Sequence, residues 1–153
     1  MFCPVGFADL DHPYLQFTFA GEKTMVNNES VKGKVVLINF WFEGCHPCMA
    51  EMAAFNDLFN RMKNSKDFIF ISVTRDDKET IKRVKEKFSL DFDVFSASGK
   101  ECQRLTFGCG YPTSIILDKK GVLKYHSSGG SIVQEEANQF IMTTLLPEIE
   151  SLL

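Results

Sequence analysis

The sequence lacks any long hydrophobic run, and none approaches the roughly 18 apolar residues that a membrane-spanning helix needs. It also lacks an excess of positive charge, because 17 Lys and Arg stand against 20 Asp and Glu, for a formal net charge of −3. This balance argues against a nucleic-acid interface and against binding to anionic membranes. The opening residues MFCPVG carry neither the basic start nor the apolar stretch of a secretory signal.

Cysteine is scarce and odd in number, with five in 153 residues. A disulfide-stapled secreted scaffold is therefore not expected. Only Cys45 and Cys48 have motif spacing, which favours one catalytic pair with spare thiols. Free buried thiols are the default expectation for Cys102 and Cys109, with a second disulfide or a relay pair left open. Cys3 gives no signal of its own.

The length suits one domain, 1–153, whose first 33 residues are polar and irregular with a possible short edge strand at Phe17 and Phe19. The nearly continuous apolar runs 35–42 and 68–73 predict strands buried on both faces. Between them, apolar residues from Cys48 to Met62 recur with a helical period of about 3.6.

The remaining pattern alternates helices and strands. Together these segments predict an α/β fold with a central mixed β-sheet flanked by helices. The further expected elements are a helix at 78–88 capped by Asp76 and Glu79, a strand at 92–95, a helix at 100–105, a hairpin of 113–117 and 122–125, and a last helix capped by Ser131 and broken or kinked at Pro147.

Cys45 stands where the first buried strand ends and the periodic helix begins. Two cysteines at i and i+3 in a first helical turn have β-carbons about 5–6 Å apart, which permits a disulfide. Unpaired N–H groups and the macrodipole at a helix N-terminus stabilise a thiolate. The sequence therefore predicts that Cys45 is the attacking thiolate and that Cys48, on the apolar stripe, is the buried resolving thiol.

A zinc site is the alternative for any Cys-x-x-Cys motif. Such a site usually needs a second pair, and the only candidates are Cys102 and Cys109. A zinc site would also not require its cysteines to lie at a strand-to-helix junction, as Cys45 and Cys48 do. The redox interpretation is therefore preferred, with no metal and no organic cofactor.

Residues 35–51, VVLINFWFEGCHPCMAE, resemble the active-site segment of the thioredoxin superfamily, and GYPTSIILDKKG resembles its cis-proline loop and hairpin. The pattern Cys45-x-Pro47-Cys48-x-x-Glu51 is similar to the TlpA/ResA-type branch, whose extra central helix–strand insertion would correspond to residues 77–95. The resemblance covers nearly the whole chain from Phe17. It implies a thioredoxin-like fold and a cis peptide bond before Pro112, opposite the cysteines.

Glu51 follows Cys48 by three residues on the apolar face of the helix. A carboxyl group there is expected to be partly desolvated, with a raised pKa, and suited to exchanging protons with a thiol. The alternative is a glutamate that reaches solvent or compensates the helix dipole. Thioredoxin itself has a buried aspartate where this chain has Asn39.

Four other residues are assigned to the site. His46 is either a cation that favours the Cys45 thiolate or a neutral surface ring, and Pro47 stiffens the turn. Trp41 is expected to pack beneath the site. From the resemblance, the backbone of Tyr111 next to Pro112 would pair with an incoming peptide like an added strand.

The sequence thus predicts an enzyme, a thiol–disulfide oxidoreductase that acts on protein thiols or disulfides and is recharged by a redox partner. One alternative is a thiol peroxidase, although residues 42–44 offer neither the threonine nor the proline of that class. Another is a non-catalytic metal- or partner-binding module. A monomer is expected.

The compartment is predicted from the resemblance. The TlpA/ResA-type branch looks mostly envelope-facing, and Asn39 departs from cytosolic thioredoxin, so the chain is expected to face the periplasm with its signal absent from this sequence. Met1 and the unpaired Cys3 favour the cytoplasm instead.

Overall fold

Two buried parallel strands form the centre of the fold. In the computed structural model, which describes residues 3, 5–6 and 9–153, β3 (Val35–Trp41) pairs in parallel with β4 (Phe68–Thr74), and every residue of β3 is buried. β3 also pairs antiparallel with β6 (Thr113–Leu117). The predicted central strands and the mixed character of the sheet are confirmed.

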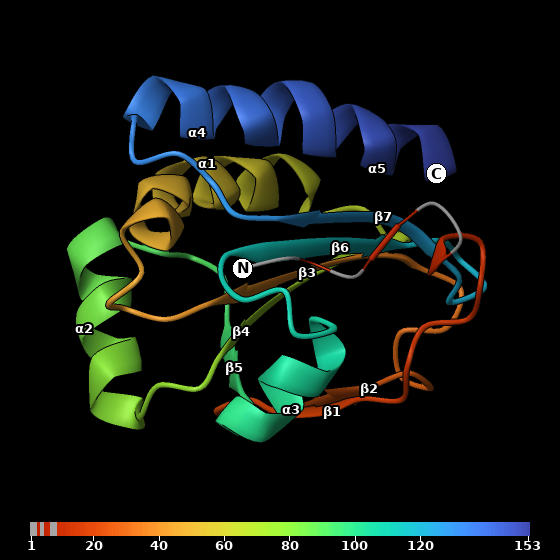
Figure 1. Cartoon of the computed structure of the whole chain (residues 1–153), viewed down its shortest axis with the longest axis horizontal. Helices are drawn as coiled ribbons and strands as arrows, with labels where there is room; N and C mark the ends of the chain where they lie inside the picture. The colour runs from red at the N-terminus through yellow and green to blue at the C-terminus, as the bar shows by residue number, and fades with distance from the viewer. Residues whose placement is uncertain (1–2, 4, 7–8) are drawn as a thin grey trace.

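Four further pairings extend this centre into one seven-stranded sheet with the order β2-β1-β5-β4-β3-β6-β7 (Figure 1). The predicted hairpin is present as β6 and β7, although β7 continues beyond the expected end at residue 125. The remaining strands are β1 (Thr18–Ala20), β2 (Met25–Asn27), β5 (Val94–Ser96) and β7 (Leu123–Ser128).

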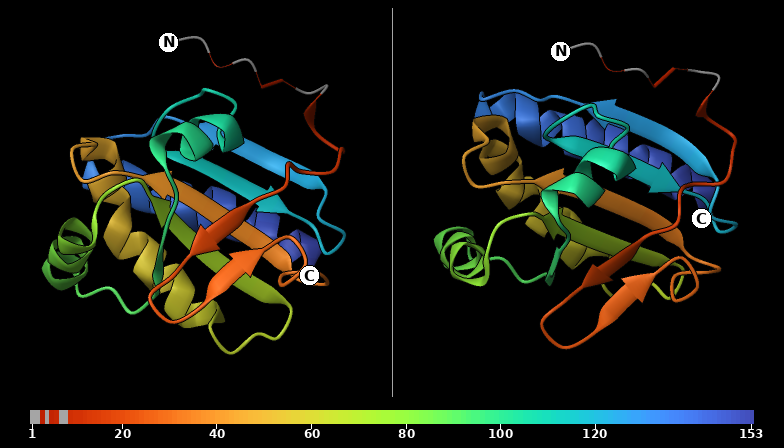
Figure 2. Two further views of the ribbon diagram at one scale, coloured as in Figure 1. Left: turned by 90° about the horizontal axis from the view of Figure 1, so that it is seen from below. Right: turned by 60° about the horizontal axis from the view of Figure 1, so that its bottom comes forward.

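Helices cover both faces of the sheet (Figures 1 and 2). On one face α1 (His46–Met62) packs beside a C-terminal helical run that comprises α4 (Gln134–Phe140), a π-helical turn (Ile141–Leu145) and α5 (Leu146–Leu152). On the other face lies α3 (Gly99–Leu105), and α2 (Lys78–Phe88) stands at one end.

The alternation of side chains along β3 divides the core between these faces. Val35, Leu37 and Trp41 join the apolar cluster under α1 and α5, whereas Val36 and Ile38 join the cluster of α3 and the N-terminal segment. The rings of Phe55 on α1 and Phe70 on β4 stack with centroids 5.3 Å apart in the first cluster. The first cluster therefore supports the helix that carries the cysteine pair.

The N-terminal part departs from the prediction. Phe19 lies in β1, but β1 pairs with β2 on one side and β5 on the other, so β2 is the edge strand. Strand β5 begins two residues later than expected. Three-residue strands give too short a hydrophobic alternation for the sequence to place them.

The two predicted helix caps, Asp76 and Ser131, are wrong. The N-cap of α2 is Asp77, whose carboxylate accepts a hydrogen bond from Thr80 N–H at 2.9 Å, whereas the carboxylate of Asp76 accepts one from Glu43 N–H. The helix α4 starts after Val133 with no side-chain cap, and Ser131 instead binds Glu136 and Val133.

Within the described residues, no helix is long and apolar enough to cross a membrane.

Candidate active site

Cys45 and Cys48 form a disulfide at the N-terminus of α1, with their Cα atoms 5.2 Å apart. Cys45 is the N-cap residue, in extended conformation, and its sulfur accepts a hydrogen bond from Cys48 N–H at 3.3 Å. Cys45 is 7% exposed and Cys48 is 1% exposed. Cys45 is thus the more exposed of the two cysteines. Its sulfur also lies at the positive end of the helix dipole, where the backbone N–H of Cys48 points toward it.

The sequence of α1 explains why this terminus attracts negative charge. Pro47 lies in the first turn, where a missing N–H costs no helical hydrogen bond. The first turn of α1, which the structure describes in full, contains no acidic residue that would compete for the helix dipole. Both features favour a thiolate at Cys45 in the reduced protein.

Glu51 lies one turn further along α1 and is 1% exposed. Its Oε1 atom has no hydrogen-bond partner among the described residues. Burial raises the pKa of Glu51 to about 8. A carboxyl group with this pKa is mostly protonated at neutral pH. Its burial and raised pKa agree with the expectation from its place on the apolar stripe.

Gly130, in the loop between β7 and α4, contributes to the site by lacking a side chain. A Cβ atom at this position would stand 3.3 Å from Glu51 Oε2, 3.2 Å from Pro112 Cγ and 3.4 Å from Pro47 Cβ. The first turns of α1 and the loop of Pro112 therefore converge on Gly130. Its place in a Gly-Gly pair between a strand and a helix was the available signal, and sequence reasoning missed it.

The loop before β6 brings Tyr111 and Pro112 to the same end of the sheet, and the bond between them is cis, as expected. The carbonyl of Pro112 accepts from Gly129 N–H at 2.8 Å, which joins this loop to the Gly130 segment. The Tyr111 ring packs edge-to-face on Phe42, and the Arg75 guanidinium lies 4.4 Å from the Phe42 centroid. Arg75 and Phe42 were not assigned to the site from the sequence.

Trp41, at the end of β3, is fully buried and packs in the core, as predicted. Its indole N–H donates to the hydroxyl of Ser72 on β4 at 2.7 Å. His46 is exposed at the first position of α1 and lines a depression of about 490 Å³ together with Met49, Val84 and Phe88. The depression therefore lies between the start of α1 and α2.

Residues before Cys45 connect the site to α2. Glu43 N–H donates to Asp76 at 2.7 Å, and the Glu43 carboxylate accepts two hydrogen bonds from Arg83, at 2.8 and 2.7 Å. These bonds hold the active-site loop against the inserted helix–strand segment. The wide sequence separation of the partners left no pattern that would have predicted them.

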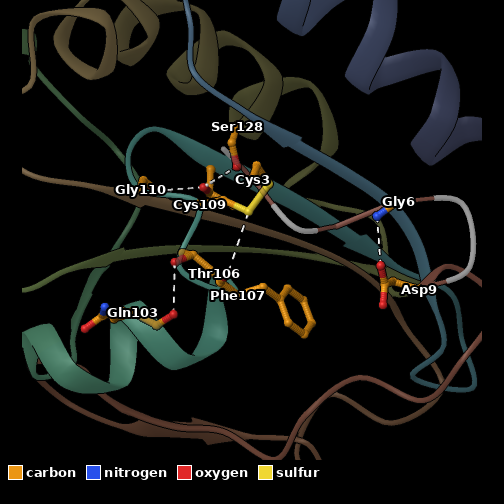
Figure 3. The surroundings of a disulfide bond; sticks show 10 residues. Cys3, Gly6, Asp9, Gln103, Thr106, Phe107, Cys109, Gly110 and Ser128 are labelled. Atoms are coloured by element: carbon orange, nitrogen blue, oxygen red, sulfur yellow. Dashed lines mark hydrogen bonds between the residues drawn. A yellow bond between two sulfur atoms is a disulfide. The ribbon is translucent and has the colours of Figure 1, made fainter. Parts of the chain in front are cut away.

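Two of the other three cysteines, Cys3 and Cys109, differ from the expectation of free thiols. Cys102 is free and fully buried, as expected, but Cys109 is joined to Cys3 by a disulfide with Cα atoms 4.6 Å apart (Figure 3). The expectation of a free Cys109 is therefore wrong, as is that of an unpaired Cys3. The four cysteines of the zinc alternative do not come together among the described residues, because Cys109 is bonded to Cys3 and no potential metal-ligating group contains Cys45, Cys48 or Cys102.

A cysteine pair that caps the helix after the central strand, near a cis-proline loop, defines a redox protein of thioredoxin-like fold. The model of the AhpC/TSA family matches residues 10–126, and the chain belongs to this family.

Comparison with known proteins agrees with the fold. Thioredoxin-like protein YneN of Bacillus subtilis is 30% identical over 109 residues, which are 70% of this chain and 62% of that protein. Thiol-disulfide oxidoreductase ResA of Bacillus thuringiensis is 32% identical over 102 residues, 65% of this chain and 58% of that one. The chain therefore spans about three-fifths of the length of these curated relatives.

Solved structures share the fold over more of the chain. A putative protein disulfide isomerase from Bacteroides thetaiotaomicron superposes with a TM-score of 0.78 at 20% identity, covering 94% of this chain and 89% of that one. A putative thioredoxin from Neisseria meningitidis gives a TM-score of 0.72 at 28% identity, covering 90% and 87%. The thioredoxin-like architecture therefore extends over almost the whole chain.

Proposed function

We propose that this chain is a thiol–disulfide oxidoreductase that exchanges its Cys45–Cys48 disulfide or dithiol with protein substrates. The observation that carries the proposal is the disulfide at the N-terminus of α1, with Cys45 as the N-cap and the more exposed partner. Two relatives bear names of this kind, thioredoxin-like protein and thiol-disulfide oxidoreductase.

In the reducing direction, the Cys45 thiolate attacks one sulfur of a substrate disulfide, and the other substrate sulfur leaves as a thiolate. Cys48 then loses its proton and attacks Cys45, which releases the second substrate thiolate and forms the Cys45–Cys48 disulfide. The substrate gains two electrons and the pair loses two. The oxidising direction is the reverse, and a separate redox partner restores the starting state.

Glu51 is proposed to take the proton of Cys48 before the second attack. A carboxylate that ionises near pH 8 and is shielded from water matches a thiol, whose ordinary pKa is about 8.5, closely enough for transfer in both directions. His46 and Pro47 are proposed to tune the Cys45 thiolate and the turn, respectively. Trp41 supports the helix from below.

Substrate binding is assigned to the loop of Tyr111 and Pro112, where an extended peptide would pair with the backbone of Tyr111. The rim of this loop carries Phe42 and the cation of Arg75, so the approaching peptide meets aromatic surface and one positive charge. The depression next to His46 offers the apolar side chains of Met49, Val84 and Phe88.

Thiol peroxidase activity is the second candidate, because the AhpC/TSA model matches the chain. The residues before Cys45 are Phe42-Glu43-Gly44, and Glu43 is committed to Arg83 and Asp76. Neither threonine nor proline is thus available beside the attacking sulfur. The same segment favours dithiol exchange over peroxide reduction.

The test is the dithiol-driven reduction of insulin, assayed beside peroxide consumption and bound metal. Insulin turnover that disappears in Cys45→Ser and persists in Cys102→Ala supports exchange at the Cys45–Cys48 pair. Peroxide consumption without insulin turnover would establish the peroxidase instead. Stoichiometric metal with neither activity would establish a binding module.

The proposed location is the cell envelope, facing the periplasm, with a monomeric chain recharged by a separate redox protein. The Cys3–Cys109 bond supports an oxidising compartment, since disulfides form and persist there and are rare in the cytosol. Fractionation of cells that produce the protein from its native gene tests this location. Recovery with cytosolic markers would contradict it and leave the exchange chemistry untouched.

A further inference from the structure

The Cys3–Cys109 disulfide lies next to an imidazole. One ring nitrogen of His126, on β7, and the two sulfurs all lie within 4.8 Å of one another. The three residues come from the N-terminal segment, the loop after α3 and the strand β7, so the fold brings them together from distant positions (Figure 3 shows the two cysteines). Each of the three is partly exposed, in contrast to the fully buried Cys102.

One ring nitrogen of His126 lacks a hydrogen-bond partner while Cys3 and Cys109 form a disulfide. This Nε2 atom is buried and has no hydrogen-bond partner among the described residues. The sulfurs of a disulfide carry no proton, so they offer this ring nothing to accept. Two thiols at the same place would offer S–H donors to the ring nitrogen that lies near the sulfurs.

We propose that Cys3 and Cys109 form a second redox centre, in which a dithiol reductant opens the disulfide and the His126 imidazole accepts a hydrogen bond from a resulting thiol. A reductant thiolate attacks one sulfur of the pair, and the other sulfur leaves as a thiolate. The second thiol of the reductant then displaces the first cysteine. The reductant loses two electrons and two protons, and Cys3 and Cys109 gain them as two S–H groups.

Opening this bond releases the N-terminal segment from the loop that carries Tyr111 and Pro112. Cys109 precedes Tyr111 by two residues, and its backbone N–H is held by Thr106 at 3.0 Å. Of the described residues before Asp11, Gly6 and Asp9 hydrogen-bond only to each other. The next attachments to the body are Leu10, which packs against the apolar cluster of α3, and Asp11, which binds Leu123 and Lys124. The disulfide is therefore the tie between the described start of the chain and the substrate loop.

The test uses the variant Cys45→Ser/Cys48→Ser, in which Cys3–Cys109 is the remaining disulfide, so its result is independent of the exchange proposed above. The folded protein is equilibrated with mixtures of reduced and oxidised dithiothreitol, alkylated, and digested. Mass spectrometry then gives the fraction of Cys3 and Cys109 in the thiol form. We expect one two-electron transition while the far-ultraviolet circular dichroism stays unchanged.

The role of His126 is tested in the same background. His126→Phe removes the acceptor and should require a roughly tenfold higher ratio of reduced to oxidised dithiothreitol for half-reduction. His126→Gln returns an acceptor and should restore most of the difference, which a loss of packing alone would not explain. His12→Phe, at an exposed histidine, is the matched control and should leave the midpoint unchanged.

Two results would overturn the proposal. One is a Cys3–Cys109 bond that stays closed until the protein unfolds. The other is a midpoint that is the same in the His126→Phe and His12→Phe variants.

Discussion

The carboxylate oxygen Oε2 of Glu51 lies 3.3 Å from the position that a Cβ atom on Gly130 would occupy. Pro112 and Pro47 border the same position at 3.2 and 3.4 Å. The bare backbone of Gly130 thus lets the loop after β7 close over the carboxyl group and the proline loop together. This closure is one source of the burial that raises the pKa of Glu51.

Gly130→Ala should therefore disturb the site more than the fold. The added methyl must displace Glu51, Pro112 or Pro47 by a few tenths of an ångström, and overpacking of this kind costs about 1–3 kcal/mol. We expect a several-fold loss of insulin-reduction rate in a protein that remains folded. Gly99→Ala is the control, since its Cβ would stand at an ordinary 3.7 Å from Arg75 Cδ. Equal rates in the two variants would argue against the close packing at Gly130.

The buried carboxyl of Glu51 should make stability depend on pH. Its pKa is raised from 4.5 to about 8, so between these values the folded state holds a proton that the unfolded state has lost. Stability should accordingly fall as the pH rises from about 4.5 to about 8, by a few kcal/mol in all. Denaturant unfolding of the oxidised protein, in which Cys45 and Cys48 do not titrate, measures this slope.

Glu51→Gln should flatten that slope, and Glu135→Gln, at an exposed glutamate, should not. A wild-type slope in the Glu51 variant would show that the carboxyl does not titrate with a raised pKa.

The rate of exchange should also depend on the ionisation of the Glu51 carboxyl group. If Glu51 takes the proton of Cys48, the rate of disulfide closure after mixed-disulfide formation rises with pH through an inflection near 8. In Glu51→Gln this inflection should disappear and the rate at neutral pH should fall by roughly 10²-fold or more. Stopped-flow measurements on preformed mixed disulfides isolate the step. An unchanged profile would reduce Glu51 to a structural residue.

Trp41 is predicted to support the site through its bond to Ser72. Trp41→Phe keeps an aromatic ring but leaves the buried Ser72 hydroxyl without its donor, which should cost about 1–3 kcal/mol of stability. A double-mutant cycle with Ser72→Ala, followed by circular dichroism, isolates the pair. Strict additivity of the two substitutions would contradict a contribution from this hydrogen bond.

The elements that place the cysteine pair could be predicted because their signals are local. The apolar run of β3 is buried on both faces, and the stripe from Cys48 to Met62 repeats through about four helical turns. Cys45 at the junction and Glu51 on the stripe follow directly from these two patterns. The burial of β3 and α1 and the assignment of Cys45 and Glu51 to the site could thus be predicted from short stretches of sequence.

The features that were missed depend on contacts between distant segments. Cys3 and Cys109 are 106 residues apart, and nothing near either residue specifies the other. Gly130 matters only because two prolines and a carboxylate meet beside it. At α2 the error was smaller: both Asp76 and Asp77 suit a cap, and the hydrogen bond from Glu43 to Asp76 decides between them.

The most direct test of the account is to trap the mixed disulfide with a substrate protein. Cys48→Ser keeps the attacking sulfur and removes the resolving one, so reduced Cys48→Ser should accumulate a covalent complex with a disulfide-containing substrate. Cys45→Ser should form none and should show no exchange. Alkylation of the reduced wild-type protein at neutral pH should modify Cys45 first. A covalent complex through Cys48 in the Cys45→Ser variant, with Cys48 the faster thiol to alkylate, would contradict the proposed roles.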